Sequence, residues 1–144
     1  MPQRHPEELA KAVGKRMYEL DRASLALGMK LDDVGVGRSK MSMTVRQDML
    51  NGHGTCHGGI IFTLADSTFA YSCNSQNHVA VAAGCSIDYL LPAYEGDVLA
   101  ATSREVALVG RSGVYDVLVE NQKGEVIATF RGRSMRIKGH VVDV

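Results

Sequence analysis

The feature that most constrains this chain is the segment from Asn51 to Asp66, in which a polar, glycine-rich loop runs directly into an apolar helix. The loop sequence NGHGTCH is followed by Gly58 and Gly59 and then by an apolar run. Asp66 lies two turns into this helix, where a charge costs free energy unless a neighbour compensates it. Free amides at a helix start and a carboxylate further along are the two groups that an acyl-transfer site needs.

The composition excludes several classes of protein. The chain has 144 residues, which is enough for one domain with a core, and we expect a single domain over residues 1–144. Its formal net charge is +0, so no strong field attracts it to nucleic acid or to an anionic membrane. No apolar run has the length of a membrane span, and the first residues lack the apolar core of a signal peptide. We therefore expect no nucleic-acid partner and no membrane partner.

The cysteines bear on the cellular compartment and on metal binding. Cys56, Cys73 and Cys85 are odd in number and have no CxxC spacing, which favours a reducing cytoplasm over a disulfide-bonded exterior. Cys56, in the polar loop, is expected to be the exposed thiol, and the other two to be small core residues. His53, Cys56 and His57 are ligand types that suit zinc. Because no second cluster of His and Cys completes a set of four ligands, no metal is predicted.

The residue pattern predicts two helices and six strands. A proline and two acidic residues favour a helix start, and apolar residues at helical spacing extend the first helix over about 6–27, with Gly28 as its C-cap. The second helix, over about 58–75, is apolar nearly all round and should therefore be buried. Alternating or β-branched segments joined by short turns predict strands at 29–36, 38–46, 79–91, 97–109, 114–121 and 125–138. The expected architecture is α+β, with a long antiparallel sheet curled around one buried helix.

Several short segments together resemble one family. They are Met49-Leu50-Asn51-Gly52-His53, Cys56-His57-Gly58-Gly59, Leu64-Ala65-Asp66, Phe69-Ala70-Tyr71, Cys73-Asn74-Ser75-Gln76, Gly113-Val114-Tyr115-Asp116 and Phe130-Arg131-Gly132. The pattern is similar to that of the hotdog-fold acyl-CoA thioesterases, above all the phenylacetic-acid-degradation (PaaI) type. The resemblance implies a curved sheet wrapped around a central helix and an acyl-CoA substrate. No cofactor is expected, since coenzyme A is part of the substrate.

The resemblance assigns the two main catalytic roles to Gly58 and Asp66. The Gly58 amide would polarise the thioester carbonyl, a role that unpaired first-turn amides and the helix dipole favour. Asp66 would act as a general base on water or as a nucleophile that forms a mixed anhydride, and the sequence leaves both open. Judged from the residues alone, Gly58 and Gly59 could serve only tight helix–sheet contact, and Asp66 could belong to a solvated polar stripe.

Further residues are assigned to catalysis or to substrate binding. Asn51 occupies the loop position at which relatives of this type orient substrate or water, so it joins the catalytic set, although an Asn-Gly turn needs no such role. The predicted substrate-binding residues are His57, Gly59, Thr63, Ala70 and Arg111. Arg111 and the basic residues of the last strand are candidates for the phosphates of coenzyme A: Arg131, Arg133, Arg136 and Lys138. Charges on that strand are also explained, residue by residue, as protection of a sheet edge.

The spacing of the two catalytic residues predicts an oligomer. Gly58 and Asp66 are eight residues apart, which is about 12 Å along a helix. One scissile carbonyl cannot touch both, so two groups that act on the same bond must come from different subunits. Two helices packed antiparallel across a twofold axis predict an obligate dimer with composite sites. The resemblance further implies a dimer of dimers, that is, a homotetramer.

The expected function is that of a cytoplasmic acyl-CoA thioesterase that releases coenzyme A and a carboxylic acid. The resemblance implies an aromatic acyl group, such as phenylacetyl or a ring-hydroxylated relative. One alternative is hydration or dehydration of an acyl thioester, but the acid–base pair of His with Asp or Glu that this chemistry needs is not found on the helix. The other is a non-catalytic acyl-CoA-binding module, since a fold alone does not determine function.

Overall fold

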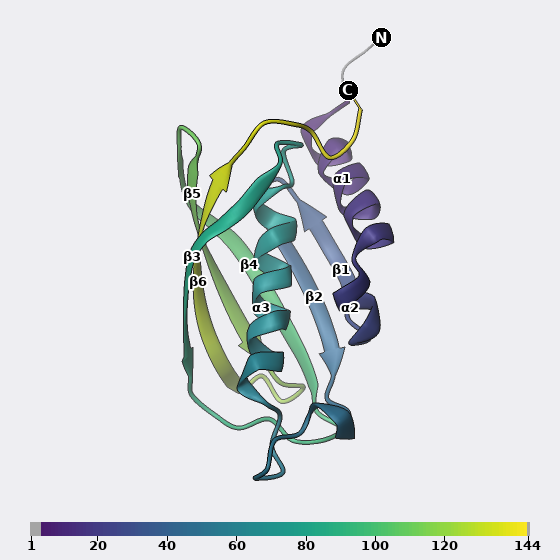
Figure 1. Ribbon diagram of the computed structural model, residues 1–144, viewed down its shortest axis with the longest axis vertical. Coiled ribbons are helices and arrows are strands. Elements are labelled where there is room, and N and C mark those ends of the chain that lie inside the picture. The colour runs from purple at the N-terminus through teal and green to yellow at the C-terminus, as the bar shows by residue number, and fades with distance from the viewer. Residues whose placement is uncertain (1–3, 144) are drawn as a thin grey trace.

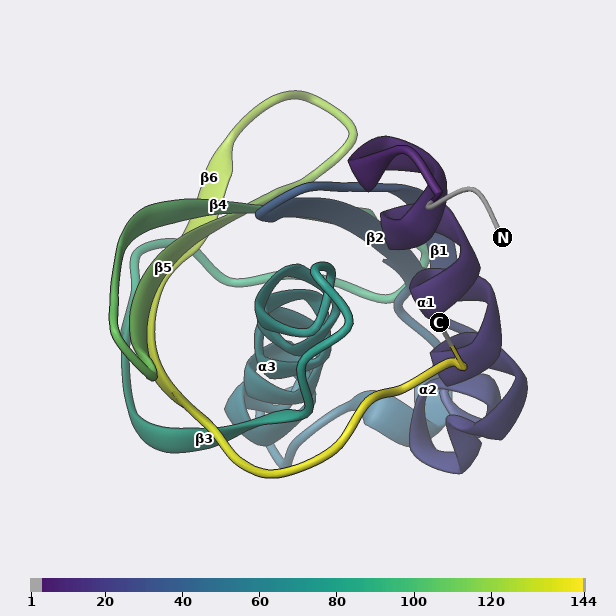
Figure 2. The same cartoon turned by 90° about the horizontal axis from the view of Figure 1, so that it is seen from above.

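The computed structural model describes residues 4–143, which form a six-stranded antiparallel sheet curled around a central helix (Figures 1 and 2). The strands are β1 (Lys30–Gly35), β2 (Arg38–Thr44), β3 (Ala80–Tyr89), β4 (Val98–Val109), β5 (Ser112–Glu120) and β6 (Val126–Arg136). The helices are α1 (Pro6–Leu20), α2 (Arg22–Ala26) and the central α3 (Gly58–Cys73), with a 3-10 turn at Gln47–Met49. The predicted α+β architecture is confirmed. No helix in residues 4–143 is long and apolar enough to cross a membrane.

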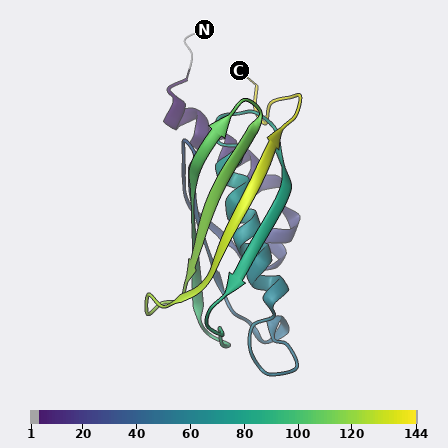
Figure 3. The ribbon, with the colours of Figure 1, turned by 90° about the vertical axis from the view of Figure 1, so that its left-hand side faces the viewer.

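The strand order is β1-β2-β4-β5-β6-β3, so β1 and β3 are the two edges of the sheet. Side chains alternate across it: in β4, Leu99, Ala101 and Ser103 are buried, whereas Thr102 and Arg104 are exposed. All six predicted strands are present, and each ends within two residues of its predicted bound. Figure 3 shows the strands lying over the helices, which occupy the inner side of the curve.

Helix α3 packs its apolar side into this curve. Leu64 and Phe69 are buried, and the ring centroid of Phe69 lies 5.6 Å from that of Tyr115 on β5 and 5.8 Å from that of Phe130 on β6. Gly132 of β6 admits the Phe69 ring, because a Cβ atom at Gly132 would approach the ring to 2.8 Å. The glycine in the last strand is therefore a packing requirement of the central helix.

The other side of α3 is only partly covered, although the sequence predicts a buried helix because it is apolar nearly all round. Thr63, Asp66 and Ala70 are half-buried and Gly59 is exposed, although the helix is mostly apolar. Within the described residues, no helix or strand covers the side of α3 that faces the viewer in Figure 1. A single chain thus leaves one stripe of its central helix accessible.

The N-terminal helix is broken at Asp21, whereas the sequence predicts one helix over about 6–27. Helix α1 ends at Leu20, and Asp21 leaves the helical region with φ −82° and ψ 85°. The Asp21 carboxylate accepts a hydrogen bond from the amide of Ser24 at 3.1 Å and so caps α2. It also accepts one from the hydroxyl of Tyr71 on α3 at 3.0 Å. The break therefore ties the N-terminal helices to the central helix, a tertiary contact that helical periodicity does not reveal.

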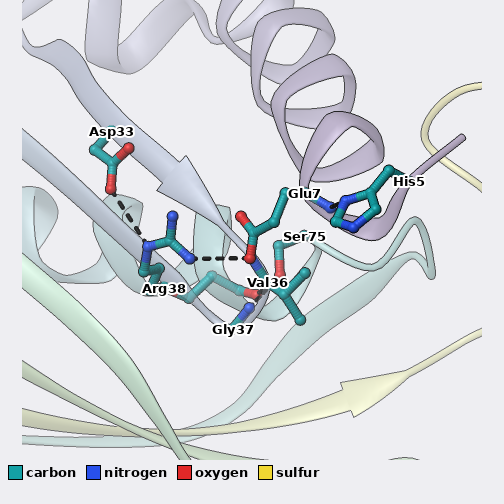
Figure 4. Close-up of polar contacts among 8 residues, drawn as sticks. His5, Glu7, Asp33, Val36, Gly37, Arg38 and Ser75 are labelled. Carbon is teal, nitrogen blue, oxygen red and sulfur yellow. Dashed lines mark hydrogen bonds and ion pairs between the residues drawn. The ribbon is translucent and has the colours of Figure 1, made fainter.

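Ion pairs and a hydrogen bond hold the β1–β2 hairpin between α1 and the end of α3 (Figure 4). Arg38 Nη1 donates to Glu7 Oε1 of α1 at 3.1 Å, and Arg38 Nε lies 3.5 Å from Asp33 Oδ2. The hydrogen bond from Arg38 lowers the pKa of the Glu7 carboxyl. At the turn of the hairpin, the Gly37 amide donates to Ser75 Oγ at 2.9 Å, just beyond α3. The edge of the sheet at β1 is therefore anchored on both helices.

The basic residues of the last strand are not at a sheet edge, which corrects the explanation of these charges as edge protection. Strand β6 lies between β5 and β3. Arg131 donates two hydrogen bonds to the Asp116 carboxylate on β5, at 2.7 and 2.9 Å, and Arg136 donates to Gln76 Oε1 at 3.0 Å. Both arginines thus have partners within the chain.

The substitution Gly132→Ala is expected to lower the free energy of unfolding by about 1–3 kcal/mol, because the added methyl group would displace the Phe69 ring. Denaturant titration followed by circular dichroism measures this change. Gly52→Ala is the matched control, since a Cβ atom there has no neighbour within 4 Å. Equal stability of the two variants would show that the Phe69 contact does not constrain the core.

Candidate active site

The loop before α3 is organised by the side chain of Asn51. Asn51 Oδ1 accepts hydrogen bonds from the amides of His53 and Thr55, at 2.9 and 3.2 Å, and Asn51 Nδ2 donates to Thr55 Oγ1 at 3.0 Å. A backbone hydrogen bond from the Asn51 amide to the Thr55 carbonyl, of 2.8 Å, closes the turn. The Asn51 side chain is thus committed to shaping this loop, and its contact with substrate or water stays a prediction.

The cysteines depart from the expectation in two of three cases. Cys56 is 5% exposed rather than free in solvent, because its amide donates to the Ala93 carbonyl at 2.8 Å and the residue forms a β-bridge with Leu50. Cys85 is exposed on the edge strand β3 rather than buried, and Cys73 is buried as predicted. A polar loop can fold back onto the core, and a residue in an apolar segment is exposed when that segment forms the edge of a sheet.

The imidazole of His57 caps the start of α3. Its Nδ1 accepts a hydrogen bond from the Gly59 amide at 2.9 Å, so the neutral ring carries its proton on Nε2. Thr63 Oγ1 donates to the Gly59 carbonyl at 2.8 Å, one turn further along. Because its N–H is occupied by His57, Gly59 cannot donate to a ligand in this conformation.

The amide of Gly58 is the free donor at this helix start. The Gly58 carbonyl accepts a hydrogen bond from the hydroxyl of Tyr89 on β3 at 2.8 Å, whereas its N–H has no hydrogen-bond partner in residues 4–143. The residue borders a pocket of about 340 Å³. The pocket is lined by Cys56, Gly58, Ile61, Tyr89, Leu90, Leu91 and Pro92. An unpaired first-turn amide beside a pocket can stabilise a developing oxyanion.

Asp66 presents a desolvated carboxylate on the open side of α3. Its Oδ1 lies 3.9 Å from the Sγ of Cys85, whose thiol donates the one hydrogen bond found for this carboxylate in the described residues. Burial raises the pKa of the Asp66 carboxyl, and the hydrogen bond from Cys85 partly opposes that rise. A carboxylate that loses water without gaining an ion pair is a better proton acceptor than an exposed one.

The structure brings some of the predicted residues together and separates others. Thr63, Asp66 and Ala70 share the open stripe of α3, which Gly59 begins. Arg111 lies in the β4–β5 turn, at the opposite end of the sheet from the loop before α3 (Figure 1). Within one chain it is therefore remote from the free helix-start amide. Nor do three His, Cys, Asp or Glu side chains gather as a metal site in residues 4–143.

Two residues that touch the predicted catalytic groups, Cys85 and Tyr89, are not among the predicted site residues. They lie four residues apart on β3, so the alternation of a strand places both on the face toward α3. That alternation is visible in the sequence. Which strand lies beside the open part of α3 is decided only by the order of the strands.

Comparison with protein families matches residues 53–128 to the family described as Thioesterase superfamily. The chain belongs to the thioesterase superfamily. This thioesterase is 46% identical over 125 residues to the acyl-coenzyme A thioesterase PaaI of Escherichia coli (strain K12), a match that covers 87% of this chain and 89% of that relative. The predicted family is thereby confirmed.

Solved structures agree with this assignment. The E. coli PaaI protein from the phenylacetic acid degradation operon superimposes with a TM-score of 0.93 and 43% sequence identity, covering 94% of this thioesterase and 99% of that chain. A Streptococcus mutans UA159 protein bound to acetyl CoA superimposes with a TM-score of 0.75 and 28% identity, covering 78% and 90% of the two chains. The predicted hotdog fold is confirmed.

Asp66→Asn is expected to raise the free energy of unfolding near neutral pH. Because burial raises the pKa of Asp66, the folded protein resists ionisation that the unfolded chain undergoes freely, and this cost grows as the pH rises through the raised pKa. The advantage of the variant should vanish below pH about 4, where the unfolded chain also keeps its proton. Denaturant titration over a range of pH measures both effects.

The matched control is Asp116→Asn, which should change stability in the opposite direction. The hydrogen bonds from Arg131 lower the pKa of Asp116, so its charge stabilises the fold near neutral pH and that contribution is lost as the pH falls. If Asp66→Asn also destabilised the protein near neutral pH, the Asp66 carboxylate would be favourably paired rather than desolvated.

Proposed function

We propose that this protein is an acyl-CoA thioesterase that hydrolyses acyl-CoA to coenzyme A and a carboxylic acid. The observation that carries the proposal is the Gly58 amide, which has no hydrogen-bond partner in residues 4–143 and opens a helix that also bears the desolvated Asp66. The relation to E. coli acyl-coenzyme A thioesterase PaaI supplies the substrate class.

In this proposal the thioester carbonyl oxygen accepts a hydrogen bond from the Gly58 amide, which stabilises the oxyanion as the carbonyl carbon is attacked. In one route Asp66 removes a proton from water, the hydroxide adds to the carbon, and the C–S bond breaks to release the coenzyme A thiolate, which then takes up a proton. In the other, an Asp66 oxygen attacks, the thiolate leaves, and water hydrolyses the mixed anhydride. The raised pKa of Asp66 suits both routes, because it increases the basicity of the carboxylate.

The acyl group is proposed to be aromatic, of the phenylacetyl type. The structure of the E. coli relative is that of a protein from the phenylacetic acid degradation operon. The pocket beside Gly58 is lined mainly by apolar and aromatic side chains, among them Ile61, Tyr89, Leu90 and Leu91. Such a lining favours burial of an apolar acyl group.

Each active centre is proposed to be shared between two subunits. Gly58 and Asp66 of one α3 are about 12 Å apart, too far to act on one carbonyl. The half-buried stripe of α3 and the edge strand β3, on which Val81 and Tyr89 are 45% and 49% exposed, offer a surface for a second copy. Pairing across this surface would set each Gly58 near the partner's Asp66, and two such dimers would form the homotetramer.

The cytoplasm is the proposed location. Cys56, Cys73 and Cys85 are all free thiols, as expected in a reducing compartment.

Wild-type protein is expected to cleave phenylacetyl-CoA faster than short or long straight-chain acyl-CoAs. Asp66→Asn should lower kcat by orders of magnitude yet still bind acyl-CoA, because it removes the base or nucleophile and keeps the shape of the side chain. Loss of thioester absorbance should be followed, since a thiol reagent would also react with the exposed Cys85. A wild type that binds acyl-CoA without cleaving it would favour the non-catalytic binding module. A wild type that adds water to enoyl-CoA would favour the hydratase.

Gly58→Pro is expected to lower kcat about 10²–10³-fold, because proline has no N–H to donate to the oxyanion. Proline suits the first position of a helix, and the ψ of 133° at His57 is compatible with a following proline. Gly58→Ala places a Cβ atom at the same position, 3.2 Å from the ring of Tyr89, and keeps the N–H, so it measures the steric effect alone.

Gly58→Pro also tests the shared centre when it is combined with Asp66→Asn in one oligomer. Co-expression with two affinity tags and purification on both isolates mixed oligomers. In each mixed dimer within them, one centre has both intact groups and the other has neither. Mixed dimers should recover about half of the wild-type activity. Activity no higher than that of the parent variants would mean that each centre lies within one chain.

A further inference from the structure

Strand β3 contacts both catalytic groups of α3. The Sγ of Cys85 lies 3.9 Å from Oδ1 of Asp66, and the hydroxyl of Tyr89 lies 2.8 Å from the carbonyl oxygen of Gly58. Four residues of a strand span about 13 Å, and eight residues of a helix span about 12 Å. Because these lengths match and the two elements run in opposite directions, one face of β3 reaches both ends of the catalytic segment of α3.

We propose that Cys85 and Tyr89 are positioning residues of the thioesterase, Cys85 for the carboxylate of Asp66 and Tyr89 for the oxyanion donor of Gly58. The inference rests on the proposed function and deepens it. The family resemblance, which assigns catalytic roles to Gly58 and Asp66, assigns no role to either residue.

Tyr89 acts through the peptide that joins Gly58 to Gly59. The carbonyl oxygen of this peptide, from Gly58, accepts a hydrogen bond from the Tyr89 hydroxyl. The N–H of the same peptide, from Gly59, donates to Nδ1 of His57 at 2.9 Å. The peptide is therefore held at both ends, which fixes the direction of the neighbouring Gly58 N–H. The ring of Tyr89 also lies 3.2 Å from the position that a Cβ atom of Gly58 would occupy, so the two residues are in close contact.

Cys85 acts through a single hydrogen bond. Its thiol donates to Oδ1 of Asp66, so Oδ2 remains free to accept a proton from water or to attack the thioester carbon. Partial loss of solvent and the nearby Asp66 raise the pKa of Cys85, so the thiol keeps its proton and remains a hydrogen-bond donor. Cys73 of α3 is the other titratable group that interacts with Asp66 in the described residues, and its thiol donates instead to the Ala70 carbonyl at 3.6 Å.

Neither contact is explained by a need of the fold. Within one chain Cys85 is exposed and Tyr89 is 49% exposed, so the folding of that chain does not require these contacts, because water could satisfy both side chains. Both belong to the edge strand, whose backbone pairing with β6 does not depend on these side chains.

The test compares Cys85→Ala, Cys85→Ser and Tyr89→Phe by the pH dependence of kcat and KM for phenylacetyl-CoA, followed by thioester absorbance. In Cys85→Ala the acidic limb of the pH profile of kcat should shift to higher pH by at least about 0.3 pH unit, because Asp66 loses the hydrogen bond that lowers its pKa. Cys85→Ser restores a donor and should move the limb back. Tyr89→Phe should lower kcat about three- to tenfold with KM and the acid limb unchanged.

Ile87→Val is the matched control, because Ile87 lies between the two residues on the same face of β3 and makes no polar contact with α3. It should leave the acid limb and kcat as in the wild type. If Cys85→Ala and Tyr89→Phe have the same pH profiles of kcat and KM as the wild type, while Asp66→Asn is inactive, the inference about β3 is overturned and the proposed function stands. A wild type that cleaves no acyl-CoA would instead overturn the proposed function.

Discussion

The contact between Phe69 and Gly132 sets the orientation of the central helix, on which the rest of the structure depends. The Phe69 ring occupies the space that a side chain at Gly132 would fill, with aromatic neighbours on β5 and β6. A helix whose Phe69 is fixed against the sheet has no freedom to rotate. Because helical positions repeat every 3.6 residues, the same rotation turns Thr63, Asp66 and Ala70 to the open side.

That open side has a cost that the function explains. The Asp66 carboxylate is desolvated without an ion pair, and the Gly58 amide has no hydrogen-bond partner in residues 4–143. The Asp66 charge lowers the stability of the fold, since a charged group that loses water is normally paired. The proposed hydrolysis uses both groups, as a basic carboxylate and as a donor that is vacant until the oxyanion forms. In the proposed dimer, one helix would place its amide in one centre and its carboxylate in the other.

Periodicity and turn chemistry predict most of the fold correctly. The central helix is predicted over about 58–75 and found at Gly58–Cys73, because its loop and its apolar run are both local features. The N-terminal helix is predicted as continuous but is broken at Asp21. The Asp21 carboxylate at this break accepts a hydrogen bond from the hydroxyl of Tyr71, which belongs to another element. Cys56 and Cys85 exchange their expected environments for a similar reason. Burial depends on where a loop folds back and on which strand forms the edge.

The sequence by itself determined the α+β class and, through its resemblance, the family. It also singled out Gly58 and Asp66 as the candidate catalytic pair, because a glycine-rich loop before an apolar helix and a lone carboxylate are local patterns. The spacing of the two residues predicts further that, if both act on one bond, a single chain does not complete a centre. Only the tertiary structure decided that β3 lies beside α3 and that Cys85 and Tyr89 touch the two groups. Strand order is set by contacts between residues far apart in the chain, and no local pattern encodes such contacts.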